Sequence, residues 1–414
     1  MYLSSLAHRD RLFDIATRWF ADEVAPEDGR HLTEIFAFES LISGPPVRRF
    51  LIDMLTRIHG VGPRFQRICV KDDLRRAIIA GCPRLNQRAE MLFRHYHETP
   101  EEFFPRTPVD LILAFGAGHD LLGMSRIKRI RRIAEKASRR VADRLAGAIN
   151  WHARALANRR AQQAGLAVDQ LVSPPETMSD EFARAERTVS LAFRDRRLRF
   201  APLDLQIDDV IGFKLVGTRE QLERVPDLIA EQPGAEILER EEHSGTYNAV
   251  NLIVELTLPD VDTIAGWMAG RDWTFAVERG LAADTLTERF REYVATGART
   301  ICAEVILTTY DELIESEFGR CIHEQRILQQ RTSAPYSGRI ATNASYIIEY
   351  MLMLAISPRI QISEVPVKMW GHYLPDTLST AVWNLFSLQN PENLCDVLTL
   401  VPDEVYTVLD LVFP

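Results

Sequence analysis

Residues 206–218 read QIDDVIGFKLVGT, and the pattern of the chain changes at this stretch. Two aspartates precede a run of β-branched and aromatic apolar residues, which predicts a strand. Three more strands are predicted at 236–242, 249–258 and 300–308. Helices are predicted at 218–231, 260–268, 286–294 and 311–330. Strands that alternate with helices in this way predict an α+β fold, with helices flanking a mixed sheet.

Helical patterns lie on both sides of this sheet region. Apolar residues recur at helical spacing before residue 120, which predicts a helical N-terminal domain. Residues 124–163 carry one amphipathic stripe surrounded by arginines, which predicts one long helix or two in line. The tail returns to helical spacing from Ala344 onward. We therefore predict a helical N-terminal domain (1–120), a sheet core with insertions (121–330) and a helical C-terminal extension (331–414).

Composition narrows the class of protein. Of the 414 residues, 46% are hydrophobic and 26% are charged, which excludes a disordered chain or a fibre. The longest apolar run has seven residues, too few to span a bilayer, and charges interrupt the start of the chain where a signal peptide needs apolar residues. Five scattered cysteines, with no Cys-x-x-Cys pair, exclude a disulfide scaffold and the usual zinc sites. We expect a cytoplasmic protein with no membrane partner.

Charge is unevenly distributed along the chain. The net charge of −9 excludes general binding of polyanions by the whole protein. Residues 126–160, however, carry twelve basic side chains against two acidic ones. Almost all basic residues are arginines, and the chain has only five lysines: Lys71, Lys128, Lys136, Lys214 and Lys368. Because lysine is so rare here, a lysine inside a motif is informative.

Two of the predicted strands carry carboxylates. Asp209 follows Asp208 in the first strand, and Glu304 lies among apolar residues in the last. A buried carboxylate is costly unless a cation compensates it. Mg²⁺ held by carboxylates from two strands is a common arrangement in phosphoryl transfer. The alternative is that Asp209 and Glu304 cap a sheet edge or pair with arginines, and their spacing alone does not separate these interpretations.

These residues resemble the RelA/SpoT alarmone synthetase domain, which has a nucleotidyltransferase-like fold. That family's last signature reads Glu-x-Gln-Ile-Arg-Thr, then Ala-Glu-x-Gly, then Ala-Ala-His. The run 304–323 matches it without a gap at Glu304, Thr309, Glu317, Gly319 and His323. The family's Asp-x-x-Gly-x-Arg strand is similar to 209–214, its Gly-Tyr-Gln-Ser-Leu-His loop to 247–251, and its Arg-x-Lys helix to 126–128. The four pieces occur in the family's order.

The resemblance implies a role for each matching residue. Asp209 and Glu304 would be the catalytic and magnesium-binding carboxylates. The nucleotide-binding residues that it implies are Arg126, Lys128 and Lys136 along the ATP phosphates, Tyr247 on the acceptor base, and Lys214, Asn251 and His323. The implied reaction is Mg²⁺-dependent transfer of pyrophosphate from ATP to the 3′-hydroxyl of a guanine nucleotide or an RNA end. The implied partners are ATP and that acceptor.

Several positions differ from the family pattern. Lys214 and Thr308 stand where the family has arginine, Ile306 stands for glutamine, and Asn251 stands for histidine. Lysine keeps the charge of arginine but loses its planar fork. These differences leave a second hypothesis open, in which the chain is a catalytically inactive module that binds a nucleotide or a partner. We prefer the enzyme, because Asp209 and Glu304 are both present.

Other candidate sites have simpler interpretations. His95 and His97 are two residues apart on a predicted helix, so they point apart and cannot share one metal ion, and we expect both at the surface. The dipeptide 119–120 (His-Asp) fits a loop. The glycines at 116 and 118 are a weak candidate for a nucleotide-binding loop, because no strand is predicted before them and no third glycine follows at the required place. Residues 58–63 look like a helix-hairpin-helix turn, but a plain helix break is the better interpretation and we do not expect DNA binding. The apolar stretch 346–356 is either core or a dimer seam, so a homo-oligomer is possible.

Overall fold

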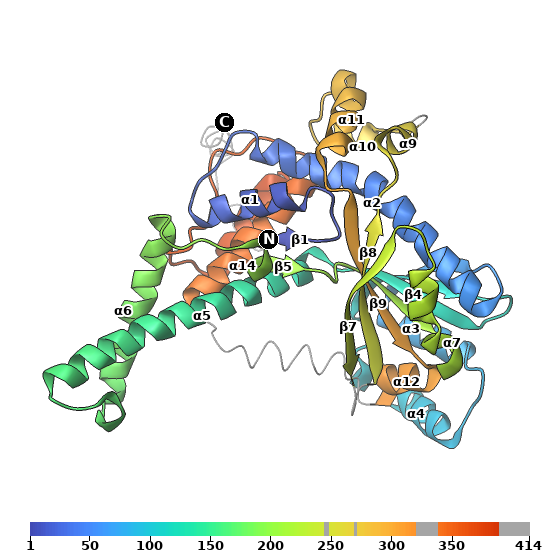
Figure 1. The fold of residues 1–414 in the computed structure, drawn as a ribbon, viewed down its shortest axis with the longest axis horizontal. Coiled ribbons are helices and arrows are strands. Elements are labelled where there is room, and N and C mark those ends of the chain that lie inside the picture. Colours follow the sequence, from blue (N-terminus) through green and yellow to red (C-terminus); the bar gives the residue numbers. More distant parts are fainter. Residues whose placement is uncertain (244–247, 269–270, 320–337, 389–414) are drawn as a thin grey trace, which may run out of the picture.

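The computed structural model describes residues 1–414 except 244–247, 269–270, 320–337 and 389–414. A seven-stranded mixed sheet forms its centre (Figure 1). In spatial order its strands are β2 (Arg64–Val70), β3 (Pro108–Phe115), β4 (Leu121–Ile127), β6 (Ile211–Val216), β9 (Thr300–Thr308), β8 (Ala249–Thr257) and β7 (Ala235–His243). β6 and β9 are parallel neighbours, and the other pairs described in this sheet are antiparallel. A separate parallel pair joins β1 (Tyr2–Leu3) to β5 (Gln206–Ile207).

Helices surround the sheet. They are α1 (Arg9–Phe20), α2 (Asp28–His59), α3 (Lys71–Ala80), α4 (Gln87–Glu98), α5 (Ile130–Gln163), α6 (Pro175–Arg194), α7 (Arg219–Glu223), α8 (Val225–Ala230), α9 (Val261–Gly266), α10 (Thr274–Val277), α11 (Leu286–Thr296), α12 (Tyr310–Ile314), α14 (Arg339–Ile356) and α15 (Asp376–Leu385). Short 3₁₀ turns occur at Pro100–Phe103, Val168–Gln170, Pro202–Leu205 and Ala283–Thr285, and a π-helix occupies Glu315–Gly319. None of the described helices is long and apolar enough to cross a membrane.

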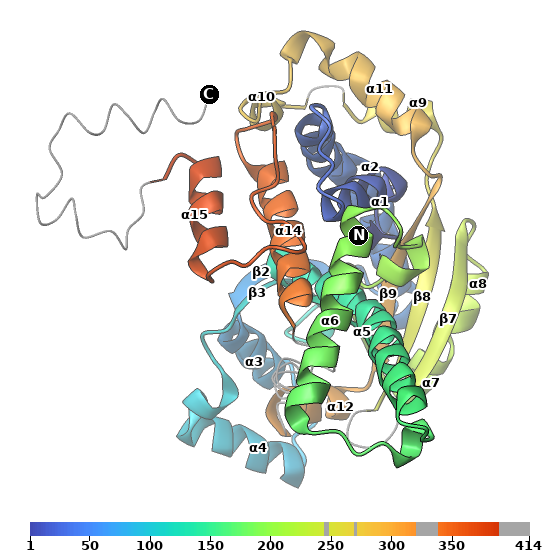
Figure 2. The ribbon, with the colours of Figure 1, turned by 90° about the vertical axis from the view of Figure 1, so that its left-hand side faces the viewer.

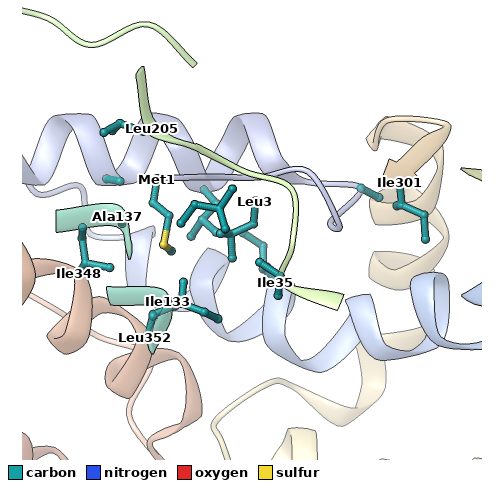
Figure 3. Close-up of a cluster of buried hydrophobic side chains, with 14 of the residues drawn as sticks. Met1, Leu3, Ile35, Ile133, Ala137, Leu205, Ile301, Ile348 and Leu352 are labelled. Atoms are coloured by element: carbon teal, nitrogen blue, oxygen red, sulfur yellow. The ribbon is translucent and has the colours of Figure 1, made fainter. Parts of the chain in front are cut away.

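The two faces of the sheet are covered differently. One face packs into the main core, where the ring of Phe213 on β6 lies 6.1 Å from that of Phe50 on α2. Figure 3 shows side chains from the N-terminal segment, α2, α5 and α14 meeting in this core. The opposite face is covered over β2, β3 and β4 by a second cluster that includes α3, α4 and α12. Over β8 and β7 this second face is half-buried or exposed, so the cover that the described residues form ends near β6 and β9.

One long helix leaves the body of the molecule. The first half of α5 packs against α14, and its second half pairs with α6 to form an arm that extends away from the sheet (Figures 1 and 2). A helix of this length spans about 51 Å at 1.5 Å per residue. The expected amphipathic helix over 124–163 is therefore confirmed, although it begins at Ile130.

The strands of the sheet core are mostly where the sequence places them. β7, β8 and β9 confirm the strands predicted at 236–242, 249–258 and 300–308. β7 is an edge strand with charged outward side chains, which discourage pairing with another chain. The apolar stretch 346–356 lies in α14, and most of its side chains are buried in the main core, which confirms the core interpretation.

The helical interpretation of 1–120 is wrong at three places: β2 and β3 lie there and extend the central sheet, and the short β1 pairs with β5. β2 is an edge strand with mostly exposed polar residues, so it lacks the alternating apolar pattern of a half-buried strand. The helix-hairpin-helix alternative for 58–63 is also wrong, because α2 ends at Gly60 and a strand begins at Arg64. The division into three domains stays a prediction.

Two further expectations are corrected near the motifs. The stretch 206–218 forms two strands rather than one, because the chain leaves strand geometry between β5 and β6, at Asp208 and Asp209. Arg126 was expected on a helix with Lys128, but it lies near the end of β4, and Lys128 lies in the turn before α5. In both cases a charged motif residue, Asp209 or Arg126, lies at or next to the end of a strand.

Candidate functional site

The two motif carboxylates approach the same part of the sheet. Glu304 lies in the middle of β9, directly opposite Gly212 on the parallel neighbour β6. Asp209 lies three residues before Gly212, where the chain enters β6. The backbone N–H of Lys128 donates to the carbonyl of Val210 at 2.9 Å, which joins this entry to the end of β4. The end of β4 therefore lies beside both carboxylate-bearing segments.

Arg126, Gly212 and Glu304 form one row across β4, β6 and β9. An Arg126 guanidinium nitrogen (Nη2) donates to Glu304 Oε2 at 3.4 Å, over the glycine that separates them. A Cβ at Gly212 would lie 3.3 Å from that oxygen and 3.5 Å from Arg126 Nε. The Asp-x-x-Gly spacing therefore places a residue without a side chain where this ion pair crosses the sheet. Glu304 is 8% exposed, so its charge depends on such a partner.

Asp209 is held by two lysines. Lys128 Nζ lies 2.7 Å from Asp209 Oδ2, and Lys136 Nζ contacts the same oxygen from the first turns of α5. Burial alone would raise the pKa of Asp209, but the charges of Lys128 and Lys136 outweigh it and lower that pKa well below its usual range. Burial, with a smaller contribution from Arg126, lowers the pKa of Lys128 to about 8. Asp209 and Lys128 are therefore both charged at neutral pH.

A second buried pair lies next to this row. Lys71, the first residue of α3, approaches Glu317 Oε2 to 2.7 Å, and both side chains are almost fully buried. Burial lowers the pKa of Lys214 on β6 to about 8, while the charges of Glu317 and Glu304 act in the opposite direction. Burial would raise the pKa of Glu317, but the nearby Lys71 and Lys214 charges lower it. The charges of both Glu304 and Glu317 therefore act on Lys214.

Local structure explains how the last signature reaches this position. Thr309 is the N-cap of α12: its hydroxyl accepts from the Glu312 backbone N–H, and its own N–H donates to the Glu312 carboxylate. This capping box ends β9 and turns the chain back along the sheet. The π-helix that follows carries Glu317, and π-turns occur often at functional sites.

Lysine use across the chain identifies this region independently of any motif. Four of the five lysines belong to this network: Lys71, Lys128, Lys136 and Lys214. The fifth, Lys368, pairs with Asp22 elsewhere. The sequence analysis did not assign a role to Lys71 or Glu317. The rarity of lysine was the only signal for Lys71, and Glu317 was already a motif match.

The remaining predicted residues are placed as follows. Asn251 lies on β8 opposite Ile306, which is two residues beyond Glu304, so Asn251 and Glu304 share a face of the sheet. Asn251 Nδ2 lies 3.3 Å from His243 Nε2, and its Oδ1 is buried with no hydrogen-bond partner among the described residues. Tyr247 and His323 lie outside the described residues. Their assigned roles therefore stay predictions.

The donor set is compatible with Mg²⁺. Asp209 Oδ1 is buried and has no hydrogen-bond partner in the described part of the chain, so it is an available hard oxygen ligand. No group of three or more His, Cys, Asp or Glu side chains suited to a metal ion occurs among the described residues. Mg²⁺ is usually bound by one or two carboxylates together with substrate phosphates, so Asp209 and Glu304 would suffice. That the two carboxylates share one ion stays a prediction.

The other candidates from the sequence behave as expected. His95 and His97 are exposed on α4, which confirms the interpretation as surface histidines. The dipeptide 119–120 and the glycines at 116 and 118 lie in the turn between β3 and β4, which confirms the loop. A strand does precede these glycines, contrary to expectation, but another strand rather than a helix follows them.

The chain was compared with protein-family models, curated proteins and solved structures. No protein-family model matches the chain, and no curated protein matches it. Among solved structures, the chain is similar to the small alarmone synthetase 1 from Bacillus subtilis at 10% identity. The match covers 44% of this chain and 71% of that one, with a TM-score of 0.19. A likeness this weak adds no evidence about the site, so the function must be inferred from the residues of the chain itself.

Proposed function

We propose that the chain transfers a pyrophosphoryl group from ATP to the 3′-hydroxyl of a guanine nucleotide or of an RNA end. One observation carries this proposal: two residues of one short segment, Arg126 and Lys128, contact the two carboxylates, Glu304 and Asp209. These four residues come from three of the motifs that resemble the RelA/SpoT alarmone synthetase domain, and their contacts support a single charged cluster. A cluster that joins several cations to two carboxylates suits the binding and reaction of a polyphosphate.

The reaction requires one bond to form and one to break. The acceptor 3′-oxygen bonds to the β-phosphorus of ATP, the bond from that phosphorus to the α,β-bridging oxygen breaks, and AMP leaves. Glu304 would take the proton of the acceptor hydroxyl, because it is a buried carboxylate at the centre of the cluster. Mg²⁺ bound by Asp209 and Glu304 would neutralise charge on the phosphates.

The lysines would hold the phosphates. About a third of the Lys136 side chain is exposed (34%). Its ammonium is therefore close to solvent and can turn from Asp209 toward a phosphate. Lys128 is 7% exposed and stays beside Asp209. Lys214 would supply further positive charge, because it lies on β6, the strand next to the one that carries Glu304. Positioning and charge compensation of this kind account for most of phosphoryl-transfer catalysis.

A specific observation keeps the second candidate, an inactive nucleotide- or partner-binding module. Thr308 stands where the family has an arginine, and its hydroxyl donates to the neighbouring backbone carbonyl of Thr309 at 3.3 Å rather than into the cluster. Two lysines compensate the negative charge of Asp209, which is also the arrangement of a purely structural ion-pair group. The enzyme predicts a product, whereas the inactive module predicts binding of a nucleotide or a partner without any product.

The test is incubation with ATP labelled at the γ-phosphate, Mg²⁺, and a panel of acceptors that contains GDP, GTP and RNA with a free 3′-hydroxyl. We expect a labelled product with at least one acceptor, and its loss in Glu304→Gln. The matched control is Glu255→Gln, which removes a carboxylate from the same face of the neighbouring strand β8. ATP binding without a labelled product for any acceptor would favour the inactive module.

A further inference from the structure

One face of the arm helix α5 carries a continuous polar and basic stripe. Its members recur every three or four residues, which keeps them on one side of the helix. They are Arg140, Arg144, Gly147, Trp151, Arg154, Asn158 and Gln162, and each is exposed. Over 22 residues the stripe runs for about 33 Å along the arm, at 1.5 Å per residue.

The stripe begins at the candidate site. Lys136, which contacts Asp209, lies one turn before Arg140 on the same side of α5. The buried side of the helix carries Val141, Leu145 and Ile149, which pack into the main core. The stripe residues are therefore not needed for packing, and they connect the phosphate-binding lysine to the outer arm.

The stripe itself contains no carboxylate, although the whole protein has a net charge of −9. Asp143 flanks it, and Arg144 has a long ion pair of 3.7 Å with Asp204 in the Pro202–Leu205 turn. Arg140 and Arg154 are exposed to solvent. A row of arginines on an otherwise acidic protein attracts a ligand with repeated negative charges.

Trp151 lies at the centre of this row. It is 67% exposed, and the described ring contact that it makes is with its neighbour His152, edge to face at 4.8 Å between centroids. An exposed indole with Arg154 one turn after it and Arg144 two turns before it offers a stacking surface between charge contacts. That combination is typical of surfaces that bind single-stranded nucleic acid, where bases stack on aromatic rings and arginines follow the phosphates.

We propose that this stripe binds a single-stranded polynucleotide and directs its 3′ end toward the Asp209–Glu304 cluster. The direction of the strand rests on the proposed function, whereas the binding itself does not. A duplex fits less well, because paired bases are not free to stack on Trp151. The proposed enzyme would then prefer the end of a polynucleotide to a free nucleotide as its acceptor.

The test measures binding of a short fluorescein-labelled oligouridine to the full chain by fluorescence anisotropy at several salt concentrations. The oligodeoxyuridine of the same length and a hairpin duplex are measured alongside. Trp151→Ala should weaken binding by about tenfold, since stacking contributes about 1–3 kcal/mol per base. Arg140→Ala with Arg154→Ala should lower the slope of log affinity against log salt by about 1.4, at about 0.7 per lost phosphate contact.

The matched control is Arg184→Ala with Arg187→Ala, which removes the same charge from exposed positions of α6 on the same arm. This control should bind as wild type does. No binding by wild type, equal losses in stripe and control variants, or tighter binding of the duplex would each overturn the inference. Equal binding of the two single strands would support it and show that the 2′-hydroxyl is not read.

Transfer assays separate this inference from the proposed function. Stripe variants should lose labelling of an RNA 3′ end and keep any labelling of GDP or GTP, because the nucleotides do not reach the arm. Glu304→Gln should lose labelling of every acceptor and still bind the oligouridine. Oligouridine binding without any transfer would therefore contradict the proposed function and leave the stripe intact.

Discussion

Two buried glutamates, Glu304 and Glu317, allow a test that separates catalysis from structure. They are 8% and 4% exposed, and both lie in the charged network. Replacing each by glutamine keeps its shape and removes its charge. Because their partners differ in exposure, we expect opposite results from the two substitutions.

Glu317→Gln should destabilise the fold. Its partner Lys71 is 2.7 Å away with 7% of its side chain exposed, so water cannot replace the lost carboxylate. Leaving a buried charge without its counter-charge costs about 3–5 kcal/mol. At roughly 2 °C per kcal/mol for a chain of this size, the Tm should fall by about 5–10 °C.

Glu304→Gln should leave stability within about 1 kcal/mol of wild type, because its partner Arg126 is partly exposed and can be solvated. Arg126 Nη2 lies 3.4 Å from Glu304 Oε2, and 31% of the arginine side chain is accessible. Transfer activity, in contrast, should fall by about 10²–10⁴-fold, the usual effect of losing a general base. The stable variant should therefore be the inactive one.

The assays are thermal unfolding at pH 7 and formation of labelled product from ATP. A third variant, Lys71→Met with Glu317→Gln, is the control for the buried pair. It should recover much of the lost Tm, because both members of the buried ion pair are then neutral. Equal loss of Tm in Glu304→Gln and Glu317→Gln, with no wild-type activity on any acceptor, would show that Glu304 is a structural ion-pair partner and refute its catalytic assignment.

Three further predictions follow from single contacts. Lys136→Gln should weaken ATP binding several-fold at nearly unchanged Tm, whereas Lys368→Gln, which breaks a similarly exposed pair elsewhere, should not affect titration by ATP. Burial lowers the pKa of Lys128 to about 8, so its positive charge is present at pH 7 and is lost as the pH rises; ATP affinity should fall from about pH 8 upward, and a flat profile would contradict this. Gly123→Ala should lower the free energy of unfolding by about 1–3 kcal/mol, because its Cβ would lie 2.6 Å from a backbone carbonyl of β6, whereas Gly147→Ala, with open space around it, should be neutral or stabilising.

The sequence predicts those elements whose stability is local. β9 could be predicted because nine residues combine apolar and β-branched side chains, and α5 because its apolar stripe repeats at helical spacing. β2 could not be predicted, because it is an edge strand that is stabilised by pairing with β3, and its exposed polar residues follow no strand pattern. The end of β4 was assigned to the following helix because Arg126 continues the basic pattern of α5.

The candidate site divides in the same way. Asp209 and Glu304 could be found because the motifs around them resemble a known family, and β6, which follows Asp209, pairs with the strand that carries Glu304. The Lys71–Glu317 pair could not, because 246 residues separate its members and no local pattern reports a contact between α3 and a π-helix. Only the scarcity of lysine indicated that Lys71 belonged to a site.

The use of lysine in this network follows from the chemistry of the two cations. Elsewhere the chain relies on arginine, which keeps its charge and forms broad planar contacts. An ammonium is compact, and its flexible stem lets it move between neighbouring acceptors. Lys136 contacts Asp209 from a partly exposed position, which suits exchange between that carboxylate and a phosphate. Arginine at position 136 would preserve the charge, but its planar guanidinium would have to contact a single carboxylate oxygen, Asp209 Oδ2, that Lys128 already contacts. Charge alone therefore does not explain the choice of lysine.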